Sequence, residues 1–308
     1  MILKKSLLFV LHVLIFTAAF PIAVSADMGP KASVVIDFDG IGIYGETYYV
    51  TLLSSVDSTG PYSALSFHQK RSPGIADEEW YFGDEKDYPI YLKFLEYQDD
   101  DGYYFLRYFQ NCSATNRFIW GYHPPSNFKI LLYFPEKESY MVSAQSYERY
   151  AFDSYFAASI NDEVQTGTYY KRGMEVIKSY DYSGEIISLV ARIILTVIIE
   201  LIVAIFFAFR GKKELLFILA VNAATQIILN TALNLINFHY GQMIFVFAYL
   251  LLELLVFIFE AVIYTVFLRK FSNESSVTKW KPAIYALVAN TASFIVGLWL
   301  ANIIPGIF

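Results

Sequence analysis

Four long apolar runs dominate the second half of the sequence, at about residues 186–209, 214–236, 243–268 and 282–304. Each run is long enough to cross a lipid bilayer as a helix, which requires ~20 apolar residues. Basic residues gather between the first two runs and between the last two, while residues 237–242 contain no Lys or Arg. The pattern therefore predicts a bundle of four transmembrane helices over residues 186–306.

Polar side chains recur inside the apolar runs at helical spacing. The second run carries a carboxamide at every fourth position from Asn222 to Asn234, and a step of four residues keeps side chains on one side of a helix. Such groups are unstable against lipid tails without partners, so we expect the polar rows to face a common axis. We expect Glu200 and Glu253 to approach a carboxamide there, first of all Gln226. The predicted intramembrane polar site comprises Arg192, Glu200, Asn222, Gln226, Asn230, Asn234, Glu253, Glu260 and Asn290.

Residues 27–160 show a different pattern, in which short β-branched and aromatic runs are separated by Gly and Pro. Such runs favour a β-rich domain, either α+β or sandwich-like. Residues 33–38 and 47–53 flank a Gly-rich segment and are interpreted as a hairpin, while residues 89–98 are interpreted as a short helix. The polar, Tyr-rich residues 161–185 are interpreted as a linker to the membrane. Further strands are expected at residues 103–109, 117–120, 128–134, 140–144 and 151–158.

Residues 1–26 have the pattern of a secretory signal peptide. Lys4 and Lys5 precede an apolar segment, and Val24-Ser25-Ala26 places small residues before a cleavage point at Asp27. An uncleaved anchor is the alternative, and both interpretations place the β-rich domain outside the cytoplasm. The positive-inside rule then makes the two basic loops cytoplasmic and the C-terminus extracytoplasmic. The sequence thus predicts a multi-pass protein of the plasma membrane.

Composition and charge support this division of the chain. The mean hydropathy is +0.41, which is high for a soluble protein. Residues 27–185 hold 24 acidic and 13 basic residues, a net charge of about −11. An acidic extracytoplasmic domain argues against nucleic acid as a partner, because nucleic-acid binding requires a basic surface. Cys112 is the single cysteine, so the domain contains no internal disulfide and depends on its core for stability.

The predicted intramembrane polar site contains three carboxylates and one arginine, an unbalanced set of charges. Such carboxylates bind a cation, hold a proton or line a wet cavity. The alternative is a polar zipper without a ligand, in which carboxamides and protonated glutamates cross-link the helices. An intramembrane hydrolase is the weakest interpretation, because the only histidine in this half of the chain is His239, in a predicted outer loop. The pattern thus favours a protein that is not an enzyme.

The predicted extracytoplasmic domain offers no motif for a cofactor or a metal. Asp99-Asp100-Asp101-Gly102 resembles the start of a calcium loop, but position twelve of that pattern is Gln110 instead of glutamate. We therefore interpret this segment as a solvated turn. The many tyrosines of the domain are suited to binding a sugar or a protein when they are exposed, and to a core when they are buried.

The arrangement resembles a family of uncharacterised Gram-positive membrane proteins with a signal peptide, an ectodomain and four transmembrane helices. The resemblance rests on residues 27–31, 120–125, 128–135 and 222–234. It implies a Gram-positive cell envelope and implies no activity. The leading functional prediction is an envelope partner-binding or complex-assembly module in the lipid bilayer, with a membrane or cell-envelope protein as its partner. Transport of a cation, a proton or a small solute is the alternative.

Overall fold

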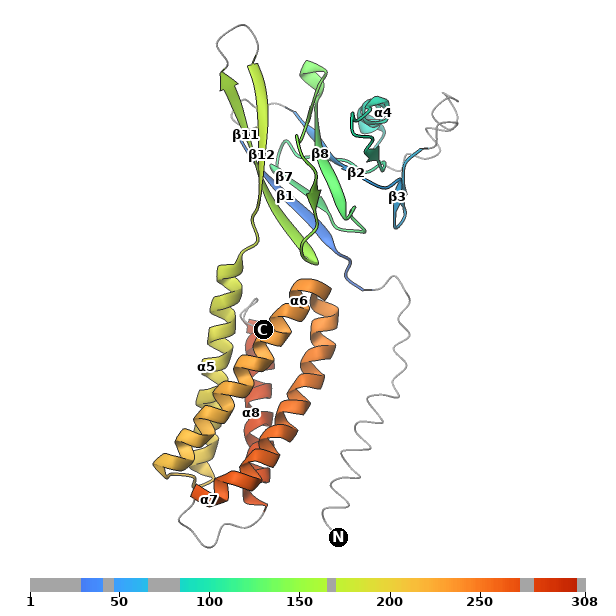
Figure 1. The fold of residues 1–308 in the computed structure, drawn as a ribbon. Coiled ribbons are helices and arrows are strands. Elements are labelled where there is room, and N and C mark those ends of the chain that lie inside the picture. The colour runs from blue at the N-terminus through green and yellow to red at the C-terminus, as the bar shows by residue number, and fades with distance from the viewer. Residues whose placement is uncertain (1–28, 41–46, 66–83, 165–169, 272–279, 304–308) are drawn as a thin grey trace. The chain divides into compact units, whose positions relative to one another are not determined.

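The computed structural model describes residues 29–40, 47–65, 84–164, 170–271 and 280–303 (Figure 1). The chain divides into two compact units, Met1–Pro30 and Lys31–Phe308, and all elements below belong to the second. A β-rich region comes first and a helical region follows, which confirms the predicted order of the two parts. The predicted signal peptide lies outside the described residues.

The β-rich region is built on two sheets. The first has the order β12-β11-β1-β7, in which β1 and β11 are parallel and the other pairs are antiparallel. The second is antiparallel and has β8 and β2 at its centre. The strands of the first sheet are β1 (Ser33–Asp39), β7 (Arg117–Trp120), β11 (Asp153–Val164) and β12 (Tyr170–Lys178). Those of the second are β2 (Tyr49–Ser54), β5 (Tyr104–Phe105), β6 (Gln110–Asn111), β8 (Asn127–Phe134), β9 (Ser139–Val142) and β10 (Tyr147–Glu148), and β3 (Ser58–Thr59) pairs with β4 (Tyr62–Ser63).

The main core lies between the inward faces of the two sheets. Alternate residues of β1, such as Val34 and Ile36, pack with Trp120 of β7 and with β8. The other face of the second sheet is covered by helix α4 (Tyr88–Glu96), which contributes Tyr91 and Phe94 to a second core (Figure 1). Because β2 is covered on both faces, all six of its residues are buried. The short helix α4 was predicted within two residues at each end.

Two sequence interpretations of this region are wrong. The strands β1 and β2 do not form a hairpin, because β1 pairs with β11 and β7 while β2 pairs with β8 in the other sheet. Residues 161–185 are not a linker: β11 continues to Val164, and β12 then pairs with it along its whole length. Both errors concern pairing with strands that are distant in sequence or polar on one face, which local patterns do not reveal.

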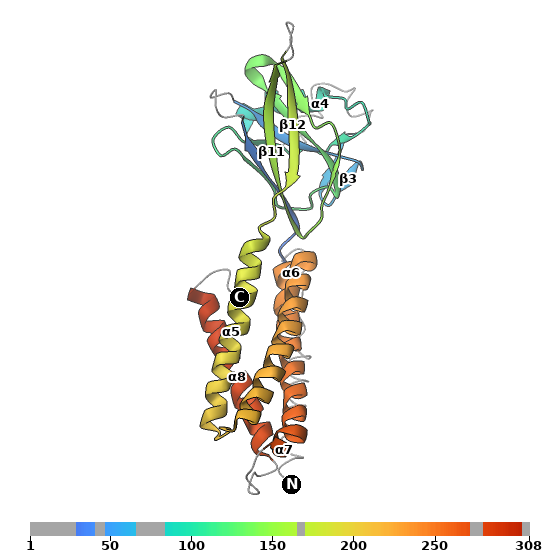
Figure 2. The same cartoon turned by 60° about the vertical axis from the view of Figure 1, so that its left-hand side comes forward.

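The helical region consists of α5 (Tyr182–Phe206), α6 (Lys212–Ile263), a π-helical turn η4 (Tyr264–Leu268), α7 (Arg269–Phe271) and α8 (Lys281–Ile303). Gly241 has φ 79° and ψ 177° and reverses α6, so that its two arms run antiparallel (Figures 1 and 2). By length and apolar composition, two stretches are suited to crossing a membrane, residues 182–206 and 212–268. The second stretch contains both the second and the third predicted span.

Candidate functional site

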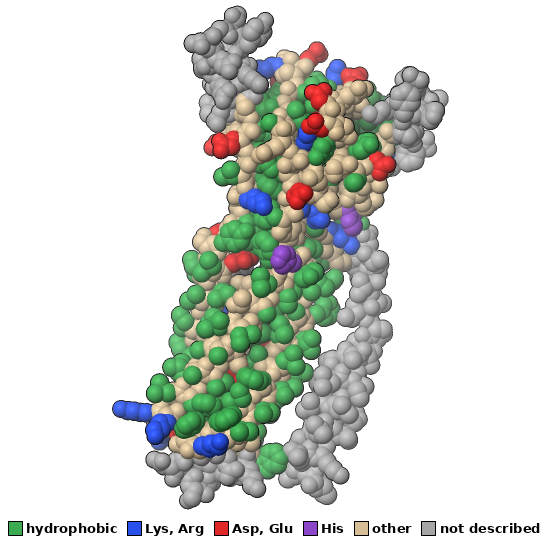
Figure 3. Space-filling model, viewed as in Figure 1, with side chains coloured by type: hydrophobic (Ala, Val, Ile, Leu, Met, Phe, Trp, Pro, Cys, Tyr) green, Lys and Arg blue, Asp and Glu red, His purple; other side chains and the backbone are tan. Residues whose placement is uncertain are grey.

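The helical region has polar residues inside and apolar residues outside. Of the nine residues of the predicted polar site, seven are buried, while Asn234 and Glu253 are partly buried. Hydrophobic side chains cover the visible face of the helices (Figure 3). The exposed apolar side chains include Ile187, Ile194, Ile198, Leu216, Ile227, Ile228, Leu250, Leu251, Ile284, Leu287 and Ile295. This distribution is the reverse of that in a water-soluble helix bundle.

Glu260, on the second arm of α6, is completely buried and has two hydrogen-bond donors. The Thr225 hydroxyl donates to Oε1 at 2.6 Å, and Asn290 Nδ2 donates to Oε2 at 2.7 Å. The carboxyl therefore connects the first arm of α6, the second arm and α8. The sequence pattern predicted Glu260 and Asn290 as site residues but missed Thr225. The prediction followed the regular row of carboxamides, which includes the neighbouring residue Gln226 and not Thr225.

Glu200, on α5, is equally buried but lacks such partners. No donor or acceptor forms a well-shaped hydrogen bond with either carboxyl oxygen, and the same holds for both amide atoms of Asn222. Asn222 and Ser293 lie beside the Glu200 carboxyl and can form only weak side-chain hydrogen bonds with it, short of good geometry. The Tyr285 hydroxyl donates to the backbone oxygen of Glu200 at 3.3 Å, so it does not satisfy the side chain.

The remaining polar residues form a separate group nearer the Gly241 end. Arg192 donates from Nη2 to Asn234 Oδ1 at 2.8 Å, and Asn230 Nδ2 donates to Gln226 Oε1 at 3.1 Å. Gln226 therefore pairs within its own helix, and the glutamates that we expected to approach it have other neighbours. Glu253 interacts with Tyr249, one turn away on the same arm. A row at every fourth position rotates by ~40° per step, so its ends face different helices.

The Asp99 turn in the β-rich region neither resembles a calcium site nor is fully solvated. Both Asp99 carboxyl oxygens lie 3.0 Å from Lys129 Nζ, and Asp101 completes the contact. Burial alone would lower the pKa of Lys129, but the hydrogen bonds that Lys129 donates to Asp101 and Asp99 outweigh it and raise the pKa. Within the described residues, no three His, Cys, Asp or Glu side chains are arranged to hold a metal ion.

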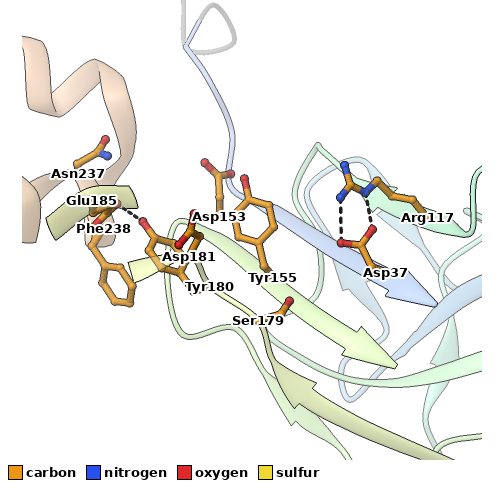
Figure 4. Close-up of a pocket in the computed structure, with 10 residues that line it drawn as sticks. All are labelled: Asp37, Arg117, Asp153, Tyr155, Ser179, Tyr180, Asp181, Glu185, Asn237 and Phe238. Atoms are coloured by element: carbon orange, nitrogen blue, oxygen red, sulfur yellow. Dashed lines mark hydrogen bonds and ion pairs between the residues drawn. The ribbon is translucent and has the colours of Figure 1, made fainter. Parts of the chain in front are cut away.

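A pocket opens beside the outward face of the first sheet (Figure 4). Arg117 forms a bidentate ion pair with Asp37 there, at 2.5 and 2.9 Å, and the Tyr180 hydroxyl donates to Glu185. The lining residues are Asp37, Arg117, Asp153, Tyr155, Ser179, Tyr180, Asp181, Glu185, Asn237 and Phe238. The carboxylates that form contacts here accept hydrogen bonds from side-chain and backbone donors of the chain itself.

No protein-family model, no curated protein and no solved structure matches this chain. Functional inference therefore rests on the geometry described above.

Proposed function

We propose that this chain is a multi-pass plasma-membrane protein whose extracytoplasmic β-rich domain binds a protein of the cell envelope. The helices would cross the bilayer four times, with the two arms of α6 as the second and third spans. Support comes from the apolar exterior and polar interior of the helical region, since lipid-facing surfaces must be apolar and polar groups must find partners inside. The basic loops would be cytoplasmic, as the positive-inside rule requires.

An exposed apolar strip across the first sheet is the observation that carries the binding role. The strand register aligns Ile119 of β7, Val35 of β1 and Tyr155 of β11 in one row, and Ile177 of β12 lies opposite Ala157 in the next. The exposed fractions are 42% for Ile119, 36% for Tyr155 and 59% for Ile177, while Val35 between the first two is buried at 7%. Aromatic and aliphatic side chains that are exposed together are typical of protein interfaces.

Charged side chains lie next to the apolar strip, as in protein interfaces that have a polar, solvent-accessible rim. The Asp37–Arg117 pair lies in the same outward rows, and Asp37 and Arg117 are both about half exposed. An apolar centre with a charged rim is how protein interfaces combine affinity with specificity. We expect a partner that offers a complementary apolar surface, either an envelope protein or another membrane subunit, and the domain then acts as an assembly module.

Site-specific photo-crosslinking in native membranes tests this function. A photoreactive residue at Ile177 or Ile119 should give one discrete adduct, whereas the same residue at Val56, which is 49% exposed, should not. The adduct should disappear when Tyr155 is replaced by Asp on the same strip. Absence of an adduct at both strip positions, or equal adducts at Val56, would contradict the proposal.

A further inference from the structure

Buried polar atoms without partners gather at one place among the helices. In the described part of the chain, six buried side-chain atoms without a well-shaped hydrogen bond belong to four residues: Glu200, Asn222, Tyr264 and Asn290. Unpaired buried polar atoms are costly and uncommon in folded proteins. Their accumulation in one cluster indicates that a group not belonging to the polypeptide completes the site.

These four residues come from four segments that converge. Asn290 is bonded to Glu260 at 2.7 Å, and the rings of Tyr264 and Tyr285 are 5.5 Å apart. Tyr285 donates to the Glu200 backbone, and Asn222 lies beside the Glu200 carboxyl. The cluster therefore joins α5, the first arm of α6, the π-helical turn and α8.

Five of the six unpartnered atoms are oxygens: two on Glu200 and one each on Asn222, Tyr264 and Asn290. A fully buried carboxylate requires a compensating positive charge. Arg192 does not supply it, because it lies eight residues earlier on α5, about 12 Å along the helix axis, and contacts Asn234. A proton on Glu200 would supply one hydrogen-bond donor, which a single neighbouring oxygen could accept. The other oxygens of the cluster would still lack partners.

We propose that Glu200, Asn222, Tyr264 and Asn290 form a binding site for a monovalent metal cation of the Na⁺ type. Glu200 supplies the single negative charge, and the two amide oxygens and the phenol oxygen supply neutral ligands. Oxygen-only ligands suit hard cations, and one free carboxylate suits a single positive charge better than a double one. The proposal concerns binding alone and does not depend on the extracytoplasmic domain having a partner.

Protons compete with the cation for Glu200, so the charged groups around it matter. Glu260 and Glu253 face it from the second arm of α6, and Glu260 already accepts two hydrogen bonds. Tyr264 and Tyr285 each lie close enough to Glu200 and Glu260 to interact with both carboxyl groups. Since the neighbouring ionisable groups are acids or phenols, each added negative charge strengthens the need for a cation. We therefore expect cation binding to be stronger at alkaline than at acidic pH.

Thermal unfolding of the purified full-length protein in lipid nanodiscs tests the proposal. Exchange of choline chloride for NaCl at constant ionic strength and pH 8.5 should raise the melting temperature of the wild type by about 5 °C at saturation. The increase should be smaller at pH 6. Glu200→Gln should melt at the same temperature in both salts, because the amide supplies no charge.

Glu253→Gln is the matched control, since it removes a carboxyl from the same bundle but none of the unpartnered atoms. It should still melt at a higher temperature in NaCl than in choline chloride, because all four proposed ligand residues remain. A wild type that responds to pH but not to Na⁺, Li⁺ or K⁺ would overturn the metal-cation site in favour of a proton alone. An equal Na⁺ response in Glu200→Gln would also overturn it.

A measurement on the wild type alone covers the case in which Glu200→Gln fails to fold. Infrared difference spectra on replacing choline with Na⁺ at pH 8.5 should show a change in a carboxyl band. The band should respond to Na⁺ and not to added choline. An unchanged carboxyl region at saturating Na⁺ would refute the site independently of any variant.

Discussion

Replacement of Asp99 by Asn should destabilise the β-rich domain through Lys129. The Lys129 side chain is 7% exposed and that of Asp99 is 2% exposed, so the ion pair is buried. The Asp99 carboxylate accepts hydrogen bonds from the backbone N–H groups of Asp101 and Tyr103, at 3.1 and 3.3 Å. The side-chain oxygen of Asn can accept both of these bonds. The change therefore removes the charge and leaves the turn in place.

The expected cost follows from the contacts that remain. Two unit charges 3.0 Å apart attract by about 5 kcal/mol at an effective dielectric constant of 20, and desolvation of both groups offsets much of this. Breaking one side of a buried pair costs roughly 3–5 kcal/mol. Asp101, which is 68% exposed, stays beside Lys129 and compensates part of the loss. We therefore expect about 2–3 kcal/mol of lost unfolding free energy for Asp99→Asn.

Urea unfolding of a fragment spanning residues 29–181 measures this cost. The two cores of the β-rich region contain no residue from α5, α6 or α8, so we expect the fragment to fold alone. Asp101→Asn is the control and should cost under about 1 kcal/mol, as exposed pairs do. The double variant Asp99→Asn with Lys129→Met should recover stability, because it leaves no unpaired buried charge. Equal effects of Asp99→Asn and Asp101→Asn would refute the reasoning.

The pH dependence has a definite sign. The folded-state pKa of Lys129 is raised, so its stabilising contribution is complete below the ordinary lysine value of about 10.4. The contribution is lost as the pH rises through the higher folded-state pKa. The stability difference between the wild type and Asp99→Asn should be constant from pH 6 to 9 and should shrink only above about pH 10.4. A difference that disappears near neutral pH would contradict the assignment to Lys129.

Three further predictions concern the helices. A cysteine at Gln242 should react with an impermeant thiol reagent in intact cells and one at Lys212 should not, and labelling of the latter would refute the topology. Gly241→Ala should destabilise by roughly 1–3 kcal/mol, because a φ of 79° is strained for any residue with a Cβ, and a melting temperature equal to that of the wild type would count against the sharp reversal. Thr225→Val should lower the melting temperature by leaving one Glu260 oxygen without a donor, and Thr225→Ser should restore it.

The elements with a strong local pattern were predictable from the sequence. The strand β7 was predicted with the bounds that it has, and β8 was predicted to within one residue. Pairing was less predictable, because β1 finds its parallel partner β11 about 120 residues later. The edge strand β12 was missed since its outward positions Gly173 and Glu175 are small or polar, although Met174 and Val176 alternate inward. Periodicity identifies a face, whereas pairing depends on the complete fold.

In the candidate site, too, the buried face of each helix was predictable from the sequence, whereas the hydrogen-bond partner of each residue was not. Exclusion of polar groups from lipid is a strong rule, and the selected residues do lie largely inside the bundle. The choice of partner depends on rotation by ~100° per residue, so a neighbour one position away faces a different helix. Thr225 and not Gln226 reaches Glu260 for this reason. The sequence gives only a weak indication that Tyr285 is buried among the helices. The indication is that Ala286 and Ala289 beside it are small residues, which allow close helix packing.

The contrast between Glu260 and Glu200 bears on what the bundle does. A polar zipper accounts for Glu260, which receives one donor from each neighbouring helix and needs no ligand. The same explanation does not account for Glu200, whose carboxyl is as deeply buried and has no comparable donor. If cross-linking were the only role of these residues, Asn222 would be expected to turn its amide onto Glu200 as Asn290 does onto Glu260. Asn222 lies beside the Glu200 carboxyl but forms no hydrogen bond of good geometry with it. This leaves a set of oxygens that a cation would complete, and this difference between two glutamates is the reason to look for one.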